Sequence, residues 1–205
     1  MIVIVDYGMG NLASIRNMFK KIGVKATVES DPDKLYYASK LLLPGVGAFD
    51  AAMQHIEDKQ LSEVLIHKAV KEQVPTLGIC LGMQLLTTQS AEGNRKGFGW
   101  IPAETLAFKT HLDQTCKVPH MGWNVVHKQG VCPLLEGFEK QQEIRFYFVH
   151  SYFVRCQNRK HAVASTHYGL DFDAVIQKDN VYGMQFHPEK SHRFGMQVFK
   201  NFAGL

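Results

Sequence analysis

A cysteine stands between two glycines in the stretch Gly78-Ile79-Cys80-Leu81-Gly82, where a short apolar run gives way to a segment with helical spacing. A sharp strand-to-helix turn raises its central side chain above the edge of a sheet, and glycines are needed there because side chains would collide. A thiol at the start of a helix also lies near the positive end of the helix dipole, which favours the reactive thiolate. The stretch taken alone favours a buried structural cysteine, so Cys80 needs partners elsewhere in the chain to be read as a nucleophile.

The second reactive pair is His187 and Glu189, which flank Pro188 near the end of the chain. Proline bars a helix and biases the residue before it toward extended geometry, in which residues two apart point the same way. A carboxylate beside an imidazole can hold it in the tautomer that accepts a proton from a thiol. His150 is a weaker candidate for the base, because no acid stands two positions from it. We therefore expect His187 to act as the base and Glu189 to orient it.

A third candidate is the stretch Gly45-Val46-Gly47, at the end of the apolar run 40–47. We expect this run to lie beside the strand that leads to Cys80, so that backbone amides could turn toward an oxyanion that develops there. Glycine permits unusual backbone angles. The peptide between Gly45 and Val46 could therefore present either its carbonyl or its amide to the site.

The elements that must position these residues alternate between β-branched runs and runs with helical spacing in the first half of the chain. Strands are expected at 2–6, 25–30, 40–47 and 74–79, and helices at 11–23, at 31–39 and within 49–73. The second half has strand-like runs at 104–109, 124–128, 144–156, 161–169 and 173–178 and a closing helix at 193–205. This order predicts a single α/β domain over residues 1–205, with a mostly parallel central sheet, helices on both faces and antiparallel strand additions in the second half.

Composition excludes several classes of protein. The 205 residues are 45% hydrophobic, enough for a core, and the formal charge of +4 comes from scattered lysines and arginines, which argues against nucleic-acid binding. No stretch approaches the ~20 apolar residues of a membrane span, and the apolar run at the start is too short for a signal peptide, so we expect a cytoplasmic protein with no membrane contact. No paired cysteines suggest a metal site, and Cys116, Cys132 and Cys156 are interpreted as structural.

Taken together, the motifs resemble a known family. GICLGMQ (78–84), PGVG (44–47) and FHPE (186–189), in this order and at these separations, are similar to the class I (triad) glutamine amidotransferases over essentially the whole chain. Within that family, DYGMGNL (6–12), KVPHMGWN (117–124) and YFVHSY (147–152) resemble the branch formed by the glutaminase subunits of imidazole glycerol phosphate synthase.

The resemblance implies a role for each matching residue. Cys80 would attack the side-chain carboxamide of glutamine to form a thioester, with His187 as base and then acid, and with Glu189 orienting His187. The resemblance further implies that amides near Gly45 and Val46 and that of Leu81 stabilise the oxyanion, and that glutamine is held by Gly47, Gln84, Ser151 and Tyr152. Gln84 stands four residues after Cys80, so on a helix it shares that face.

The resemblance also implies a partner. Glutaminases of this branch pair with a barrel-shaped cyclase subunit as a heterodimer, and the ammonia passes to a ribonucleotide substrate in histidine biosynthesis, with no metal and no cofactor. The resemblance places the stretches DYGMGNL (6–12) and PHMGWN (119–124) toward the docking face. We therefore expect Asn11, Met121, Trp123 and Asn124 at the interface. An alternative within the family is a subunit that feeds ammonia to a partner in surface-sugar biosynthesis.

A competing interpretation comes from the amino-terminal glycines. Gly8-Met9-Gly10-Asn11-Leu12-Ala13 fits the G-x-G-x-x-A pattern of dinucleotide-binding proteins, and Glu29 ends the next strand, where a ribose-binding acid would stand. Against this, Asp6 would place an acidic group near a pyrophosphate. The sequence therefore favours the amidotransferase over the dinucleotide-binding protein.

Overall fold

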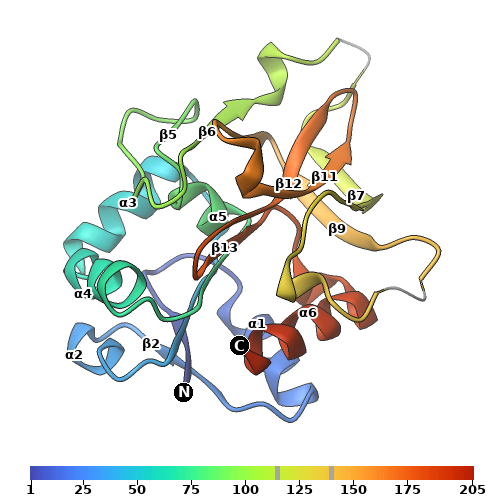
Figure 1. Ribbon diagram of the computed structural model, residues 1–205. Coiled ribbons are helices and arrows are strands. Elements are labelled where there is room, and N and C mark those ends of the chain that lie inside the picture. Colours follow the sequence, from blue (N-terminus) through green and yellow to red (C-terminus); the bar gives the residue numbers. More distant parts are fainter. Residues whose placement is uncertain (114–115, 139–140) are drawn as a thin grey trace.

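A central sheet runs through the computed structural model, which describes residues 1–113, 116–138 and 141–205 (Figure 1). Its first part consists of five parallel strands, in the order β2 (Ala26–Glu29), β1 (Ile2–Val5), β3 (Lys40–Leu43), β4 (Thr76–Ile79) and β13 (Val181–Met184). Leu43 lies opposite Gly78, so the predicted neighbourhood of the 40–47 run and the Cys80 strand is confirmed. The carboxyl ends of β3 and β4 therefore bring two of the candidate stretches to one edge of the sheet.

Helices cover both faces of the sheet, as predicted. Successive residues of β1 point to opposite faces, and the clusters that they join contain different helices. One cluster takes α1 (Leu12–Lys21) and α6 (His192–Gly204), whose rings Phe19 and Phe199 lie 4.6 Å apart between centroids. The other cluster takes α3 (Phe49–Asp58) and α4 (Ser62–Ile66), which lie across the sheet from α1 and α6, at the left of Figure 1. A five-residue π-helical segment at His67–Lys71 extends α4.

Two helix starts follow from the sequence. Asn11 caps α1 by accepting a hydrogen bond at its side-chain oxygen from the Ser14 amide at 3.3 Å. Asp31 caps the short helix α2 (Pro32–Leu35) in the same way, with Pro32 at the first position where no donor is required. None of the helices in the described part of the chain is long and apolar enough to span a membrane.

The second half adds antiparallel strands. Beyond β13 the sheet continues through the antiparallel strands β12 (Asp171–Lys178), β10 (Tyr152–Cys156) and β6 (Ala103–Ala107), and it ends at the two-residue strand β5 (Gln89–Ser90), which pairs in parallel with β6. The strand β11 (Ala162–His167) pairs with β12 and with β8 (His127–Lys128). This part of the fold agrees with the antiparallel additions that the sequence predicted.

The predicted strand at 144–156 is wrong in its continuity. The chain breaks at Ser151 into β9 (Arg145–His150), which pairs with β7 (His120–Val125) in a separate two-stranded sheet, and β10, which enters the central sheet. The predicted strand at 124–128 is also wrong in its continuity, because it is divided at Val126 between the end of β7, which begins at His120, and β8, which pairs with β11. The break lets one run of strand-forming residues serve two sheets, and it leaves Ser151 at the corner between them.

Candidate active site

The turn that carries Cys80 joins β4 to the short helix α5 (Leu81–Leu85). Cys80 has φ 53° and ψ −108°, a conformation that a residue with a side chain rarely adopts. Both flanking glycines are required by close backbone approach: a Cβ on Gly82 would lie 1.9 Å from the Leu43 carbonyl oxygen, and one on Gly78 would lie 2.5 Å from the Gly82 carbonyl oxygen. The glycines therefore let the turn pack tightly against β3 with the thiol at the carboxyl edge of the sheet.

His187 and Glu189 form a buried pair, although the predicted extended segment is wrong, because only His187 is extended and Pro188–Lys190 forms a 3₁₀ helix. Their side chains are each 2% exposed, and Nδ1 of His187 lies 2.8 Å from Oε1 of Glu189. The segment is fixed to β9, because the His187 amide donates to the Tyr147 carbonyl at 2.9 Å and the Ser191 hydroxyl donates to the His187 carbonyl at 2.6 Å. The imidazole is therefore held in one orientation, with Nε2 as the ring nitrogen left for another partner.

The electrostatics of His187 connect it to Cys80. Burial lowers the pKa of the imidazole, but the neighbouring Cys80 and the Glu189 carboxylate bonded to Nδ1 raise it by more, so that the pKa lies above its usual range. Nε2 is buried, and no described residue lies within ordinary hydrogen-bond geometry of it. This arrangement favours a protonated imidazole beside Cys80.

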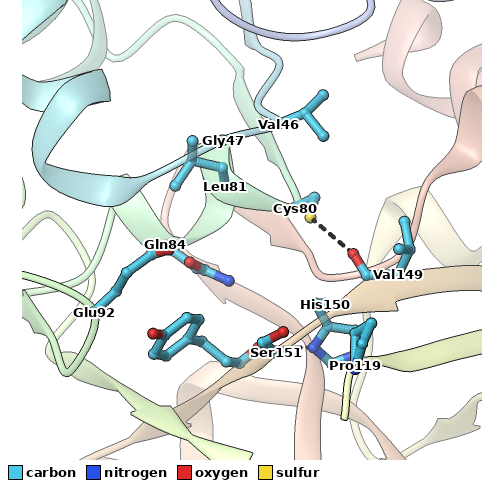
Figure 2. Close-up of a pocket in the computed structure, with 11 residues that line it drawn as sticks. Val46, Gly47, Cys80, Leu81, Gln84, Glu92, Pro119, Val149, His150 and Ser151 are labelled. Atoms are coloured by element: carbon cyan, nitrogen blue, oxygen red, sulfur yellow. Dashed lines mark hydrogen bonds between the residues drawn. The ribbon is translucent and has the colours of Figure 1, made fainter.

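A pocket of about 230 Å³ opens in front of Cys80 (Figure 2). Eleven residues line it: Val46, Gly47, Cys80, Leu81, Gln84, Glu92, Pro119, Val149, His150, Ser151 and Tyr152. The sulfur lies 3.9 Å from the Val149 carbonyl oxygen, on the side of the pocket formed by β9. The Gln84 side chain comes from the same helix as Leu81, and it points into the pocket from the opposite wall (Figure 2).

The structure brings most of the sequence-predicted residues into this pocket. Seven of them line it directly, and His187 with Glu189 lies buried beside Cys80 rather than in the lining. Gly45 lies behind the wall, where a Cβ would come 2.5 Å from the Leu81 Cβ and 2.6 Å from the Gly82 amide nitrogen. Close packing against the Cys80 turn is thus a second reason for glycine at position 45, and a β-branched replacement there would also displace Leu81.

Two polar side chains of the site were missed by the sequence analysis. Glu92 lines the pocket with a carboxylate whose Oε2 accepts a hydrogen bond from the Phe49 amide at 3.0 Å, and burial is the main reason why its pKa is raised. Gln185 is fully buried, and its amide donates to the Cys80 sulfur at 3.6 Å. The same side chain accepts from Gln84 at 3.4 Å, so it joins the nucleophile to the helix face behind it.

His150 lines the pocket but has no carboxylate partner. Its Nδ1 donates to the Tyr152 carbonyl at 2.7 Å, and its Nε2 lies 2.9 Å from Nδ1 of His120. Burial lowers the pKa of His150 to about 3 and that of His120 to about 4. Both rings are therefore neutral, and the geometry gives His150 a structural place in the wall instead of the place beside the thiol.

The residues expected at a partner interface differ in exposure. Met121 is 61% exposed and Trp123 45% exposed, and both lie on β7. Asn11 is also exposed, although its side chain caps α1. Asn124 is half-buried, and its amide reaches inward to His120 and to the His167 carbonyl. The indole of Trp123 stacks on His192 at 5.6 Å between centroids, which presents a firm apolar surface next to Met121.

The glycines of the competing interpretation have a different use in the fold. A Cβ on Gly10 would lie 3.0 Å from the Pro44 Cβ, and a Cβ on Gly8 would lie 3.3 Å from the His55 ring. The loop after β1 thus packs against Pro44 and against α3 where a dinucleotide-binding protein would receive a pyrophosphate. Among the described residues, no group of three or more histidine, cysteine or acidic side chains could hold a metal ion.

Comparison with known proteins assigns this arrangement to a family. The chain matches the glutamine amidotransferase class-I family over residues 3–204. It is 49% identical over 202 residues to the imidazole glycerol phosphate synthase subunit HisH 2 of Methanococcus maripaludis, with 98% of each chain covered. It is 47% identical over 205 residues to the protein of the same name from Pseudomonas aeruginosa, with both chains covered completely.

Solved structures share the fold at lower sequence identity. One, described as a glutamine amidotransferase, has a TM-score of 0.76 at 15% identity, and the match covers both chains completely. Another, the PurLQS structure from Thermotoga maritima, has a TM-score of 0.72 at 20% identity, and the match covers 99% of this chain and 97% of the chain in that structure. Likeness at this identity establishes the fold alone, with its parallel sheet and flanking helices.

Proposed function

Because the chain belongs to the class I glutamine amidotransferase family, we propose that it is the glutaminase subunit of an imidazole glycerol phosphate synthase. It hydrolyses glutamine to glutamate and ammonia. The observation that carries the proposal is the placement of Cys80, on a strained turn in front of a pocket, beside a His187 whose pKa is raised by Cys80 and Glu189.

The reaction uses the three side chains in order. The Cys80 thiolate attacks the side-chain carbonyl carbon of glutamine, which forms a carbon–sulfur bond and places negative charge on the oxygen. When the tetrahedral intermediate collapses, the carbon–nitrogen bond breaks and His187 gives its proton to the leaving ammonia. Water then attacks the thioester while His187 takes a proton from it, and glutamate leaves with the thiolate restored. Glu189 stabilises the imidazolium throughout through its 2.8 Å contact with Nδ1.

Backbone amides stabilise the charge on oxygen. The Leu81 amide begins α5 directly after the nucleophile, and Val46 lines the pocket from the neighbouring strand end. Loss of one such donor lowers kcat by roughly 10²–10³ in enzymes of this kind. The Gly45–Val46 peptide supplies the second donor when its amide faces the pocket.

The pocket suits the two charged groups of glutamine. Glu92 is its ionisable carboxylate, and no lysine or arginine stands among the described lining residues. The ammonium group of glutamine therefore binds Glu92, while its carboxylate is met by main-chain amides of Gly47, Ser151 and Tyr152. Gln84 holds the side-chain end from the helix face above Cys80.

A partner uses the ammonia. We place a barrel-shaped cyclase subunit, as the second chain of a heterodimer, on the face that carries Asn11, Met121, Trp123 and Asn124, where two large apolar side chains are exposed. Exposed tryptophan and methionine are typical anchors of protein interfaces. Ammonia passes directly to the ribonucleotide bound by that partner, to give imidazole glycerol phosphate and AICAR in histidine biosynthesis.

Glutamate release from glutamine tests the proposal. The purified chain is assayed alone and with a cyclase subunit and its ribonucleotide, beside Cys80→Ala. We expect release that the partner stimulates and that Cys80→Ala abolishes. Release that a surface-sugar partner stimulates and the cyclase does not would assign the chain to the alternative pathway, and a folded wild-type chain that releases no glutamate in any mixture would refute the glutaminase.

A further inference from the structure

The hydroxyl of Tyr7 is a buried polar group that the glutaminase mechanism does not use. Tyr7 follows β1 and is fully buried, and its hydroxyl donates a hydrogen bond to the Pro44 carbonyl. Burial raises the pKa of this phenol, and negative charge on Cys80 raises it further, so the group stays protonated and remains a donor. The phenol therefore lies within the electrostatic reach of the nucleophile while it binds the loop 44–47, which packs against the Cys80 turn.

The bond acts on a rigid unit. The Pro44 carbonyl and the Gly45 amide belong to one planar peptide, so a donor that fixes the carbonyl also fixes the direction of that amide. Gly45 itself is held by Leu81 and Gly82, from which its missing Cβ would lie only 2.5 Å and 2.6 Å away. With the Pro44–Gly45 peptide and the Gly45 Cα both held, the orientation of the Gly45–Val46 peptide depends on the backbone angles of Gly45 alone.

The loop after β1 covers the same segment. A Cβ on Gly10 would lie 3.0 Å from the Pro44 Cβ, and a Cβ on Gly47 would lie 2.3 Å from the Met9 Cε. The loop 7–10 therefore packs against the loop 44–47 both before and after Gly45. Tyr7 supplies the hydrogen bond of this contact, and Gly10 and Met9 supply its close packing.

We propose that Tyr7 is a positioning residue of the oxyanion loop. Its hydroxyl holds the Pro44–Gly45 peptide so that the following peptide can aim the Val46 amide at the charge that develops on the substrate. Tyr7 is not among the residues that line the pocket and acts only through the loop. The inference rests on the proposed glutaminase activity, which supplies the oxyanion that this loop would stabilise.

Tyr7→Phe tests the proposal, with Tyr182→Phe as the matched control. Tyr182 is 6% exposed and lies on β13, outside the pocket lining, so its replacement removes a tyrosine hydroxyl from the interior without touching the loop. In the complex with the cyclase we expect Tyr7→Phe to lower kcat for glutamate release about tenfold, part of the loss seen when a donor is removed outright. KM should change less than about twofold, because the bond acts on the transition state.

A second readout separates positioning from general damage. Iodoacetamide alkylates Cys80 by displacement at a saturated carbon, so no oxyanion forms, and Tyr7→Phe should react at the wild-type rate. Equal kcat values for Tyr7→Phe and Tyr182→Phe would overturn the inference, as would a parallel fall in alkylation and kcat. A wild-type chain that releases no glutamate would overturn the proposed function instead, and the inference with it.

Discussion

The hydrogen-bond chain through His120 and His150 predicts how the stability of the fold depends on pH. The Tyr152 carbonyl can only accept, so His150 carries its proton on Nδ1 and accepts at Nε2 from Nδ1 of His120. Nε2 of His120 then accepts from the Asn124 amide at 3.1 Å. When both rings are neutral, every donor in this series of hydrogen bonds has an acceptor. A further proton on either ring would make two donors face each other or leave the Asn124 amide without its acceptor.

The sign and size of this pH dependence follow from the pKa values of the two histidines. The pKa of His120 is lowered to about 4 and that of His150 to about 3, against about 6.5 in an unfolded chain. Below about pH 6.5 the unfolded chain therefore binds more protons than the folded chain, and stability falls as the pH falls toward 4. At about pH 5 the unfolded rings are charged and the folded rings are neutral, which costs about 2 kcal/mol for each ring and about 4 kcal/mol for the pair relative to neutral pH.

Urea unfolding at about pH 7.5 and about pH 5 measures this loss. The wild-type chain is compared with a variant that carries His120→Gln and His150→Gln, whose uncharged amides can donate and accept but not titrate, and with His127→Gln at an exposed position as control. Other groups titrate in the same interval, so the quantity of interest is the difference between the chains. We expect the wild type and the control to lose about 4 kcal/mol more than the double variant. A difference below about 1 kcal/mol would show that the rings are not held neutral, and the donor and acceptor roles assigned to the two histidines would then be wrong.

Two further substitutions test single roles in the site. Glu92→Gln keeps an acceptor for the Phe49 amide but removes the charge, so KM for glutamine should rise about tenfold with kcat within about twofold, and an unchanged KM would place the substrate ammonium elsewhere. Glu189→Gln removes the buried charge that raises the pKa of His187, and kcat should fall by at least about 100-fold while glutamine binding persists; a loss below about tenfold would refute the orienting role of Glu189.

The parts of the site that the sequence predicted are those governed by local rules. Glycines around Cys80 predicted a tight turn. The sequence also predicted that His187 and Glu189 would pair, but across an extended segment, whereas only His187 is extended and Pro188–Lys190 turns into a 3₁₀ helix. The alternation of strands and helices then placed the 40–47 run beside the Cys80 strand. Each of these inferences uses residues within a few positions of one another or a rule of parallel-sheet connection.

The residues that were missed depend on contacts between distant segments. Glu92 reaches the pocket because it binds the Phe49 amide, which is separated from it by two strands, and no local pattern marks that contact. Gln185 sits in an ordinary apolar-flanked segment, and only the pairing of β13 with β4 places its amide 3.6 Å from the Cys80 sulfur. The break at Ser151 has the same origin, because a run of strand-forming residues does not state where one sheet ends and another begins.

The stretch DYGMGNL shows why one motif admitted several interpretations. Its glycines predicted either a phosphate-binding turn or a docking loop, and both depend on where the backbone bends. In the structure the same bend does two things at once: it turns Tyr7 inward to the Pro44 carbonyl and leaves Asn11 exposed at the start of α1. A loop with one end buried against the oxyanion segment and the other on the expected partner face is a short physical link between them. Gly10, in close contact with Pro44, stands between Asn11 and Tyr7 in the chain, so the loop joins the expected partner face to the segment that Tyr7 binds.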